Sequence, residues 1–293
     1  MRRVCLIVNP HAGGGRTAKA LPQVEAALTG LGVEHRVEQT LSIEHAIELG
    51  RAATDAGEVA VSFGGDGLAG AVAHALRGGP GVLGVLPGGR GNDFARKLEI
   101  PTDPVEAAEV LARGVERTVD VAEVDGRTFL GIASYGFDSE VQDLANATTL
   151  VRGSLVYLYA TLRTLARWKA VRLTFEADGA GERSFDGFAV AASNSGRFGG
   201  GMQFVPDADL EDGQIDVVLC HDTTKLRYLR DLPKVFKGTH FEANESLELL
   251  RARELRVDAE RPYRIYADGD PIGTTPATIR AVPGALRVLV PAP

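Results

Sequence analysis

The chain has 293 residues, 44% of them hydrophobic and 24% charged, a balance typical of one or two folded domains rather than a disordered segment. Its net charge of −7 argues against nucleic acid as the main partner, because phosphate backbones bind basic surfaces. The sequence contains no apolar run long enough to cross a bilayer, and Cys5 and Cys220 each lie inside a short apolar run, which predicts reduced, buried thiols in a cytoplasmic protein.

The first third of the chain alternates strand-like and helix-like patterns. Apolar runs predict strands at 4–8, 33–38, 59–63 and 82–86, and apolar residues at helical spacing predict helices at 16–31, 43–56 and 68–76. Alternation of this kind builds a parallel sheet covered by helices. Ligands of such sheets bind beyond the carboxyl ends of the strands, so we expect the site there.

The pattern changes after about residue 117 and predicts a second, mainly antiparallel domain with helical insertions. Strands are expected at 117–124, 128–134, 171–177, 187–193, 215–219, 255–258, 263–267 and 286–290. Helical patterns occur at 154–168 and 226–235, and Pro233 is expected to break or restart the second of these. We place the domains at 1–118 and 119–283, and leave open whether the C-terminal strand 284–293 returns to the first.

Three loops that follow first-domain strands are rich in glycine: NPHAGGGR at 9–16, GGDG at 64–67 and PGGRGNDF at 87–94. Free N–H groups at helix N-termini favour anions, and glycine lets backbone amides approach phosphate oxygens. The first loop lacks the Gly-Lys-Ser/Thr of a Walker A loop, and the Gly-x-Gly-x-x-Gly fingerprint does not follow the first strand in proper form. Three such loops on one sheet edge predict a phosphate site.

Asp66 lies among the glycines of the second loop. An aspartate at this position is commonly a cap for the following helix. Among phosphate-binding amides, however, a carboxylate suits a magnesium ion that joins it to the phosphates, and we favour this second interpretation.

Several segments, in chain order, resemble the diacylglycerol kinase catalytic-domain family, which includes bacterial lipid kinases and is related to sphingosine and ceramide kinases. The segments are NPHAGGGR, FGGDGLAGAV, LPGGRGNDFARKL, VDVAEVDG, NSGRFGGGMQFVPDADLEDGQIDVVL and YADGDPIG. The resemblance covers nearly the whole chain, whereas GGDG alone is shared with NAD kinases and phosphofructokinases. It implies a parallel-sheet α/β nucleotide-binding domain, a C-terminal antiparallel β-sandwich domain for the lipid, and an active site between them.

The same resemblance implies ATP and Mg²⁺ as cofactors. Asp268 would be the general base that accepts the proton of a lipid hydroxyl, and Asp120 and Asp270 would be acidic neighbours near the magnesium, with Asp66. A separate structural magnesium would be held around Asp209, Asp212 and the backbone carbonyl of Gln214. The nucleotide would contact Asn9, Pro10, His11, Ala12, Gly13, Thr40, Gly64, Gly65, Asp66, Gly67, Leu68, Ala69, Gly70, Ala71, Arg90 and Asn92.

Some of these positions have simpler interpretations or depart from the family pattern. Taken alone, Asp212 and Asp268, each followed by glycine, would be turn residues. Leu68, Ala71 and Arg90 stand where the family often has threonine, glutamate and threonine, which leaves the lipid acceptor open.

The resulting hypothesis is an ATP-dependent kinase of a lipid hydroxyl, most simply of diacylglycerol to phosphatidic acid in phospholipid metabolism. A long-chain base or another glycerolipid stays open as the acceptor. The alternatives are a kinase of a soluble substrate such as NAD, against which the whole-chain resemblance argues, and a catalytically silent lipid- or nucleotide-binding protein, against which the retained aspartates argue.

Two segments suggest where a lipid could be met. The apolar, aromatic stretch at 150–171 is typical of core packing, and its alternative is an entrance for acyl chains. The stretch at 224–238 carries five basic residues against Asp231, which indicates either a solvated helix face or a seat on an anionic membrane. We expect a peripheral membrane contact and leave a homodimer open.

Overall fold

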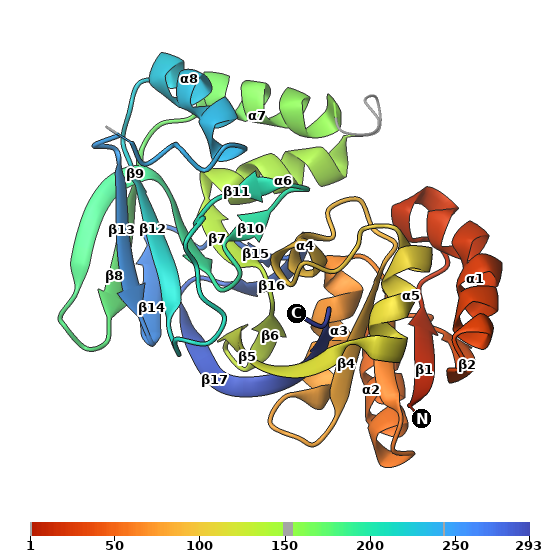
Figure 1. The fold of residues 1–293 in the computed structure, drawn as a ribbon. Helices are drawn as coiled ribbons and strands as arrows, with labels where there is room; N and C mark the ends of the chain where they lie inside the picture. Colours follow the sequence, from red (N-terminus) through yellow and green to blue (C-terminus); the bar gives the residue numbers. More distant parts are fainter. Residues whose placement is uncertain (1, 149–154, 243) are drawn as a thin grey trace.

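The computed structural model describes residues 2–148, 155–242 and 244–293, which form two lobes (Figure 1). In the first lobe the strands β1 (Arg3–Val8), β2 (Glu34–Gln39), β3 (Val59–Gly64) and β4 (Val82–Pro87) are parallel in the order β2-β1-β3-β4. Every residue of β3 is buried, as expected for a parallel strand covered on both faces. The predicted parallel sheet is therefore confirmed.

Four main helices cover this sheet: α1 (Ala12–Gly30), α2 (Ile43–Asp55), α3 (Asp66–Leu76) and α5 (Pro104–Arg113). Helix α1 packs with α5, and α2 packs with α3. Helix α5 was not predicted from the sequence, although Pro104 in its first turn and Asp103 before it are ordinary helix-start signals. Asp103 caps the helix by accepting the N–H of Val105 at 2.8 Å.

The second lobe is mainly antiparallel, with strands in the order β16-β15-β7-β9-β8-β14-β17; β12 pairs with β9 and β13, and β5 pairs with β17 and β6. Helices α6, α7 and α8 lie at one end of this lobe (Figure 1). The bounds are β5 (Val115–Val124), β6 (Arg127–Phe129), β7 (Ile132–Gly136), α6 (Phe137–Ala147), α7 (Leu155–Arg167), β8 (Val171–Ala177), β9 (Arg183–Ser193), β10 (Arg197–Phe198), β11 (Met202–Gln203), β12 (Ile215–His221), α8 (Lys225–Val235), β13 (Leu247–Ala252), β14 (Glu254–Ala259), β15 (Arg264–Ala267), β16 (Asp270–Thr274) and β17 (Ala277–Val290).

Strand β17 links the lobes. Its first half pairs antiparallel with β14, and its last residues pair parallel with β4, where Arg287 lies opposite Val82. The side chains of Leu286, Val288 and Leu289 are buried in the hydrophobic core of the first lobe. The C-terminal end of the chain thus completes the first-lobe sheet.

Some predicted elements differ from the structure. The predicted strand at 128–134 is two strands, β6 and β7, because the N–H groups of Leu130 and Gly131 bond to a carboxylate rather than to a neighbouring strand. The predicted break at Pro233 is wrong: α8 continues through Pro233 to Val235, and the proline removes a single helical N–H donor. The predicted start of α7 at residue 154 lies outside the described residues. None of the described helices has the length and apolarity needed to span a membrane.

Candidate active site

The three glycine loops meet at the carboxyl edge of the first-lobe sheet. The N–H groups of Gly88 and Gly89 both donate to the carbonyl of Gly64, at 2.7 and 3.0 Å. A Cβ on Gly89 would lie 2.5 Å from the Cα of Gly65, and a Cβ on Gly13 would lie 2.4 Å from the carbonyl oxygen of Gly88. The loops therefore touch backbone to backbone, which only glycine allows.

Arg16 joins the first loop to the third. Its Nη2 donates to the carbonyl of Gly89 at 2.8 Å, and its Nε donates to the carbonyl of Gly13 at 3.1 Å. The residues just before it, Gly13–Gly15, have φ values of 60°, 73° and 87°. We predicted no role for Arg16 from the sequence, although a basic residue at the end of a predicted phosphate-binding loop is a usable signal.

Asp66 is the first residue of α3, and its Oδ1 accepts the N–H of Phe94 at 3.2 Å. A Cβ on Gly91 would lie 3.0 Å from a carboxylate oxygen of Asp66 and 3.0 Å from one of Asp93. The pKa of Asp66 is raised, first by burial and then by the negative charge of Asp93. Two carboxylates thus share a small space beside the phosphate loops.

Asp268 reaches this region from the second lobe. It lies between β15 and β16 with φ at 52°, and its carboxylate accepts the N–H groups of Leu130 at 2.8 Å and Gly131 at 2.9 Å. Burial raises its pKa to about 7; the charge of Asp66 adds to this, and the backbone hydrogen bonds oppose it. A Cβ on Gly70 of α3 would lie 3.6 Å from Asp268 Oδ2. The site therefore lies between the two lobes.

Asp270 also faces α3. A Cβ on Gly67 would lie 2.5 Å from Asp270 Oδ2, so glycine at 67 leaves room for this carboxylate over the first turn of the helix. Burial raises the pKa of Asp270, and the charge of Arg127 opposes this. The structure thus brings Asp66, Asp268 and Asp270 together at the N-terminal half of α3, where the helix dipole favours negative groups.

The other predicted nucleotide contacts surround the same edge. Asn9 Oδ1 accepts the N–H of His11 at 3.0 Å, and the N–H of Thr40 donates to the carbonyl of Val8 at 2.9 Å, which places Thr40 beside the end of β1. Asn92 Oδ1 accepts the N–H of Gly89 at 2.9 Å. Arg90 is exposed, and Pro10 and Ala12 belong to the first loop, whereas the side chains of Leu68, Ala69 and Ala71 are buried in the first-lobe core.

Asp120 has partners outside this cluster. Its buried carboxylate accepts the N–H of Gly213 at 2.6 Å and that of Gly284 at 2.7 Å. It therefore ties the middle of β5 to the loop before β12 and to the bend in β17. The contacts of Asp120 are structural, and its predicted place near the catalytic magnesium remains a prediction.

Asp209 and Asp212, predicted to hold a structural magnesium, lie in the loop before β12. Asp209 Oδ1 accepts the N–H of Glu211 at 3.0 Å, and Asp212 Oδ1 accepts the N–H of Gln214 at 2.9 Å. Nη1 of Arg251 lies 3.7 Å from Asp212 Oδ2. Among the described residues, no group of three or more His, Cys, Asp or Glu side chains is placed to hold a metal ion.

Asp93 connects the two lobes next to the site. It begins α4 (Asp93–Lys97), and its two carboxylate oxygens accept the N–H groups of Gly200 at 2.8 Å and Gly201 at 2.9 Å, in the loop between β10 and β11. At the other end of α4, Lys97 Nζ donates to the carbonyl of Ala208. Asp93 belongs to the PGGRGNDF loop, and we predicted no role for it from the sequence.

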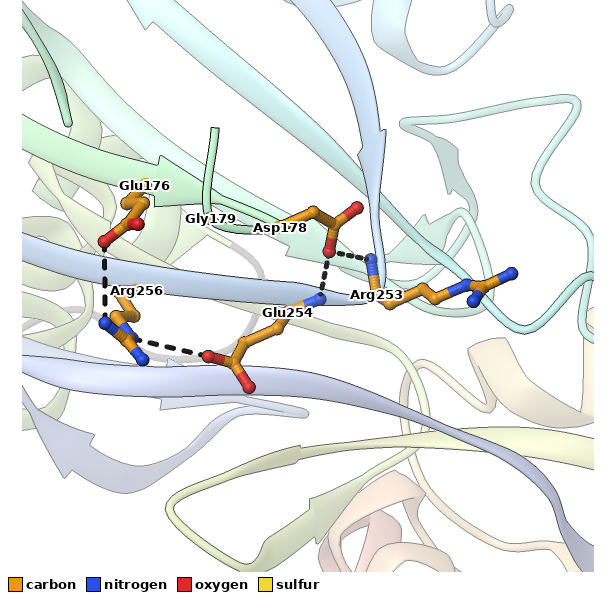
Figure 2. A pocket seen from close by; sticks show the side chains of 6 residues that line it. All are labelled: Glu176, Asp178, Gly179, Arg253, Glu254 and Arg256. Atoms are coloured by element: carbon orange, nitrogen blue, oxygen red, sulfur yellow. Dashed lines mark hydrogen bonds and ion pairs between the residues drawn. The ribbon is translucent and has the colours of Figure 1, made fainter. Parts of the chain in front are cut away.

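A separate cavity of about 480 Å³ lies in the second lobe (Figure 2). Arg256 pairs with two carboxylates of this cavity, and lies 3.6 Å from Glu176 and 3.3 Å from Glu254. Asp178 accepts the backbone N–H groups of Arg253 and Glu254, both at 2.9 Å. Because no predicted site residue lines this cavity, it is not a candidate active site.

The chain is similar to known proteins over nearly its whole length. Residues 3–124 match the family model of the diacylglycerol kinase catalytic domain, and residues 131–290 match that of the YegS C-terminal NAD kinase beta sandwich-like domain. A diacylglycerol kinase from Mycobacterium tuberculosis (strain ATCC 25618 / H37Rv) is 34% identical over 297 residues, which cover 99% of this chain and 95% of that protein.

Two solved structures share the fold. A diacylglycerol kinase from Bacillus anthracis str. Sterne superposes with a TM-score of 0.74 at 20% identity, covering 99% of this chain and 97% of that one. An NAD kinase from Archaeoglobus fulgidus, in complex with ATP, gives a TM-score of 0.51 at 15% identity, covering 99% and 93%. The predicted fold class, an α/β domain followed by a β-sandwich domain, is confirmed.

Proposed function

Because the chain belongs to the diacylglycerol kinase catalytic-domain family of lipid kinases, we propose that it transfers the γ-phosphoryl group of ATP to a lipid hydroxyl, with diacylglycerol as the leading acceptor. One observation above all supports this assignment: Asp268 of the second lobe faces Gly70 of α3, beside Asp66 and the glycine loops. In this proposal Asp268 is the general base and the glycine loops bind phosphate, so the base and the phosphates would meet between the two lobes.

The glycine loops and Arg16 would position the phosphates of ATP. Loops in backbone contact, with helices beginning beside them, present N–H groups to an anion without a side chain in the way. Arg16 spans the carbonyls of Gly13 and Gly89 and adds positive charge at this edge. Phosphoryl transfer depends mainly on such positioning and charge neutralisation.

Asp268 would act as the general base. The N–H groups of Leu130 and Gly131 fix its carboxylate, and a pKa of about 7 lets it accept a proton near neutral pH. As the lipid oxygen bonds to the γ-phosphorus, its proton passes to Asp268, and the bond to ADP breaks with its electron pair remaining on ADP.

Phosphoryl transfer from ATP needs a divalent cation, and we place a magnesium ion beside Asp66. Burial and like charge raise the pKa of Asp66, and Asp66 in turn raises that of Asp268, so a hard cation at this point would relieve their repulsion. Mg²⁺ is commonly held by one or two carboxylates and the substrate phosphates, and here Asp66 with Asp270 would hold it. When bound, the ion neutralises charge on the transferring phosphoryl group.

The location of the lipid acceptor determines where the enzyme would act. A diacylglycerol resides in a bilayer, so the proposal includes a cytoplasmic protein that contacts a membrane peripherally.

The experiment that tests this proposal measures ADP release with ATP, Mg²⁺ and mixed micelles of diacylglycerol, monoacylglycerol or a long-chain base, with NAD as a soluble acceptor. Release that depends on a lipid and not on NAD supports the proposal and names the acceptor. Release with NAD alone would assign a soluble substrate, and saturable ATP binding without release on any acceptor would indicate a binding protein.

A further inference from the structure

Helix α8 presents apolar side chains to solvent. Leu226 is 78% exposed, Leu229 36%, and Phe236 at the helix C-terminus 51%. With the exposed Pro233, these positions are spaced three or four residues apart and form one helical face. A surface helix normally carries polar residues on its outer face, so this apolar stripe is unusual.

The inner face of α8 is occupied by other residues. The ring of Tyr228 stacks on Phe188 with centroids 5.1 Å apart, and meets Phe137 edge-on at 5.2 Å. Asp231 is buried and lies 2.8 Å from Lys234. The helix is therefore anchored to the lobe on one side, and the exposed stripe is not its packing surface.

Basic side chains flank the stripe. Lys225, Arg230 and Lys237 are exposed, whereas Asp231, the single acid of α8, is buried and lies 3.1 Å from Arg230. The outer side of α8 is consequently cationic, in a chain whose net charge is −7. Apolar side chains between basic ones complement an anionic lipid surface, since each cation near such a surface contributes about 1 kcal/mol of attraction.

Helix α7 also presents apolar side chains to solvent. Tyr157, Leu158 and Leu162 are 46%, 51% and 45% exposed, and Leu158 and Leu162 are four residues apart on one helical face. Lys225 Nζ donates to the carbonyl of Ala166 at 2.7 Å, so the end of α7 contacts the start of α8, and both helices lie at one end of the second lobe (Figure 1).

We propose that this α7–α8 face binds the surface of an anionic phospholipid bilayer. The face is defined by Tyr157, Leu158, Leu162, Leu226, Leu229 and Phe236, together with the exposed Lys225, Arg230 and Lys237. Six of the ten exposed large apolar side chains in the described parts of the chain lie on it. These side chains enter the interfacial region, and the basic groups pair with lipid phosphates.

One strand connects this face to the candidate base. The N–H of Asp268 donates to the carbonyl of Ile132 at the start of β7, and β7 ends at Gly136, just before Phe137, which packs against Tyr228 of α8. Five residues of strand span roughly 17 Å, which sets the separation between the candidate base and the inner side of α8. The catalytic use of this distance rests on the proposed kinase function; membrane binding by the face does not.

The test is co-sedimentation of the full chain with vesicles of phosphatidylcholine, alone or mixed with phosphatidylglycerol. Wild type is expected to bind the mixed vesicles more tightly, and less so as salt rises. The double variant Leu226→Ser with Phe236→Ser is expected to lose about tenfold or more in partition coefficient. Arg230→Gln with Lys237→Gln is expected to lose about tenfold on mixed vesicles and little on phosphatidylcholine alone.

Matched controls change similar side chains elsewhere. Leu249→Ser alters a side chain that is 44% exposed on β13, and Lys19→Gln removes an exposed charge of α1; neither is expected to change vesicle binding. Unchanged ATP binding in every variant verifies that the fold is retained.

Two results would overturn the proposal. One is vesicle binding that the α7–α8 variants do not weaken. The other is a dimer in sedimentation equilibrium that Leu226→Ser with Phe236→Ser dissociates, without vesicle binding by wild type, which would assign the face to a second copy of the chain. A protein that binds vesicles through this face but phosphorylates no lipid would contradict the proposed function instead.

Discussion

Asp268 accepts a 2.9 Å hydrogen bond from the backbone N–H of Gly131, and a Cβ on Gly131 would lie 2.4 Å from the same carboxylate oxygen. Glycine at 131 therefore lets the backbone hold the candidate base at close range. We predict that Gly131→Ala displaces Asp268 and lowers turnover on the order of 100-fold, because small displacements of a catalytic group are costly. Initial rates at saturating ATP measure the effect.

The matched control is Gly30→Ala, at the end of α1, where a Cβ would meet nothing within 4 Å. It should leave turnover unchanged. Full activity in Gly131→Ala would show that the position of Asp268 does not depend on this contact.

The pH dependence of the reaction should report Asp268. Burial raises its pKa to about 7, and a general base works only when ionised, so kcat/KM should rise with pH and level off above an apparent pKa near 7. Because Asp66 also has a raised pKa, the observed value belongs to the interacting pair. A flat profile between pH 5 and about 8 would argue against a titrating base of this kind.

The same raised pKa has a consequence for stability. Ionisation of Asp268 is less favourable in the folded state than in the unfolded state. The resulting loss in the free energy of unfolding is absent below the ordinary pKa of 3.8 and grows until the pH reaches about 7. Asp268→Asn, which cannot ionise, should therefore gain stability relative to wild type as pH rises through this window. Urea unfolding at pH 5 and pH 8 measures the difference, and a constant difference would contradict the shift.

The contact between the glycine loops should be sensitive to a single methyl group. A Cβ on Gly89 would lie 2.5 Å from the Cα of Gly65, backbone against backbone, so neither side can yield cheaply. We predict that Gly89→Ala destabilises the protein by about 1–3 kcal/mol and weakens ATP binding. Calorimetric titration with ATP and urea unfolding check both effects, and an unchanged affinity would separate this loop from nucleotide binding.

Asp93 should matter for stability through the second lobe. Its carboxylate accepts two backbone N–H groups, from Gly200 and Gly201, in a buried position. Asp93→Ala leaves both donors without a partner and should cost about 3 kcal/mol of unfolding free energy, whereas Asp93→Asn, which keeps one acceptor oxygen, should cost about half of that. Equal losses in the two variants would contradict a role as hydrogen-bond acceptor.

Much of the fold follows from local sequence patterns. Buried strands such as β3 and β4 are nearly continuous apolar runs. The glycine loops after them predict a phosphate-binding site at the carboxyl edge of the sheet. Helix α5 was missed despite its capping signals, and β6 and β7 were merged because Leu130 and Gly131 give no local sign that their N–H groups serve a carboxylate 137 or more residues away. Contacts over such separations leave no periodic trace in a sequence.

Some of the predicted site residues lie close to one another in the structure. The carboxylates at 66, 268 and 270 were named from motifs, and the structure brings them together at α3. Arg16 had a sequence signal that was not used, whereas the contact of Asp93 with Gly200 and Gly201 joins segments more than 100 residues apart and becomes visible only in the structure. Asp120 was named from a family-like motif as a neighbour of the magnesium. In the structure its carboxylate accepts hydrogen bonds from the backbone N–H groups of Gly213 and Gly284.

The central claim is that Asp268 is the base of an ATP-dependent lipid kinase. The most direct measurement compares ATP binding and lipid-dependent ADP release between wild type and Asp268→Asn. Nearly unchanged ATP affinity together with turnover lowered by roughly 100-fold to 10,000-fold is the expected result. Turnover close to wild type, or loss of ATP binding without loss of turnover at saturating ATP, would contradict the assignment of Asp268 as the base.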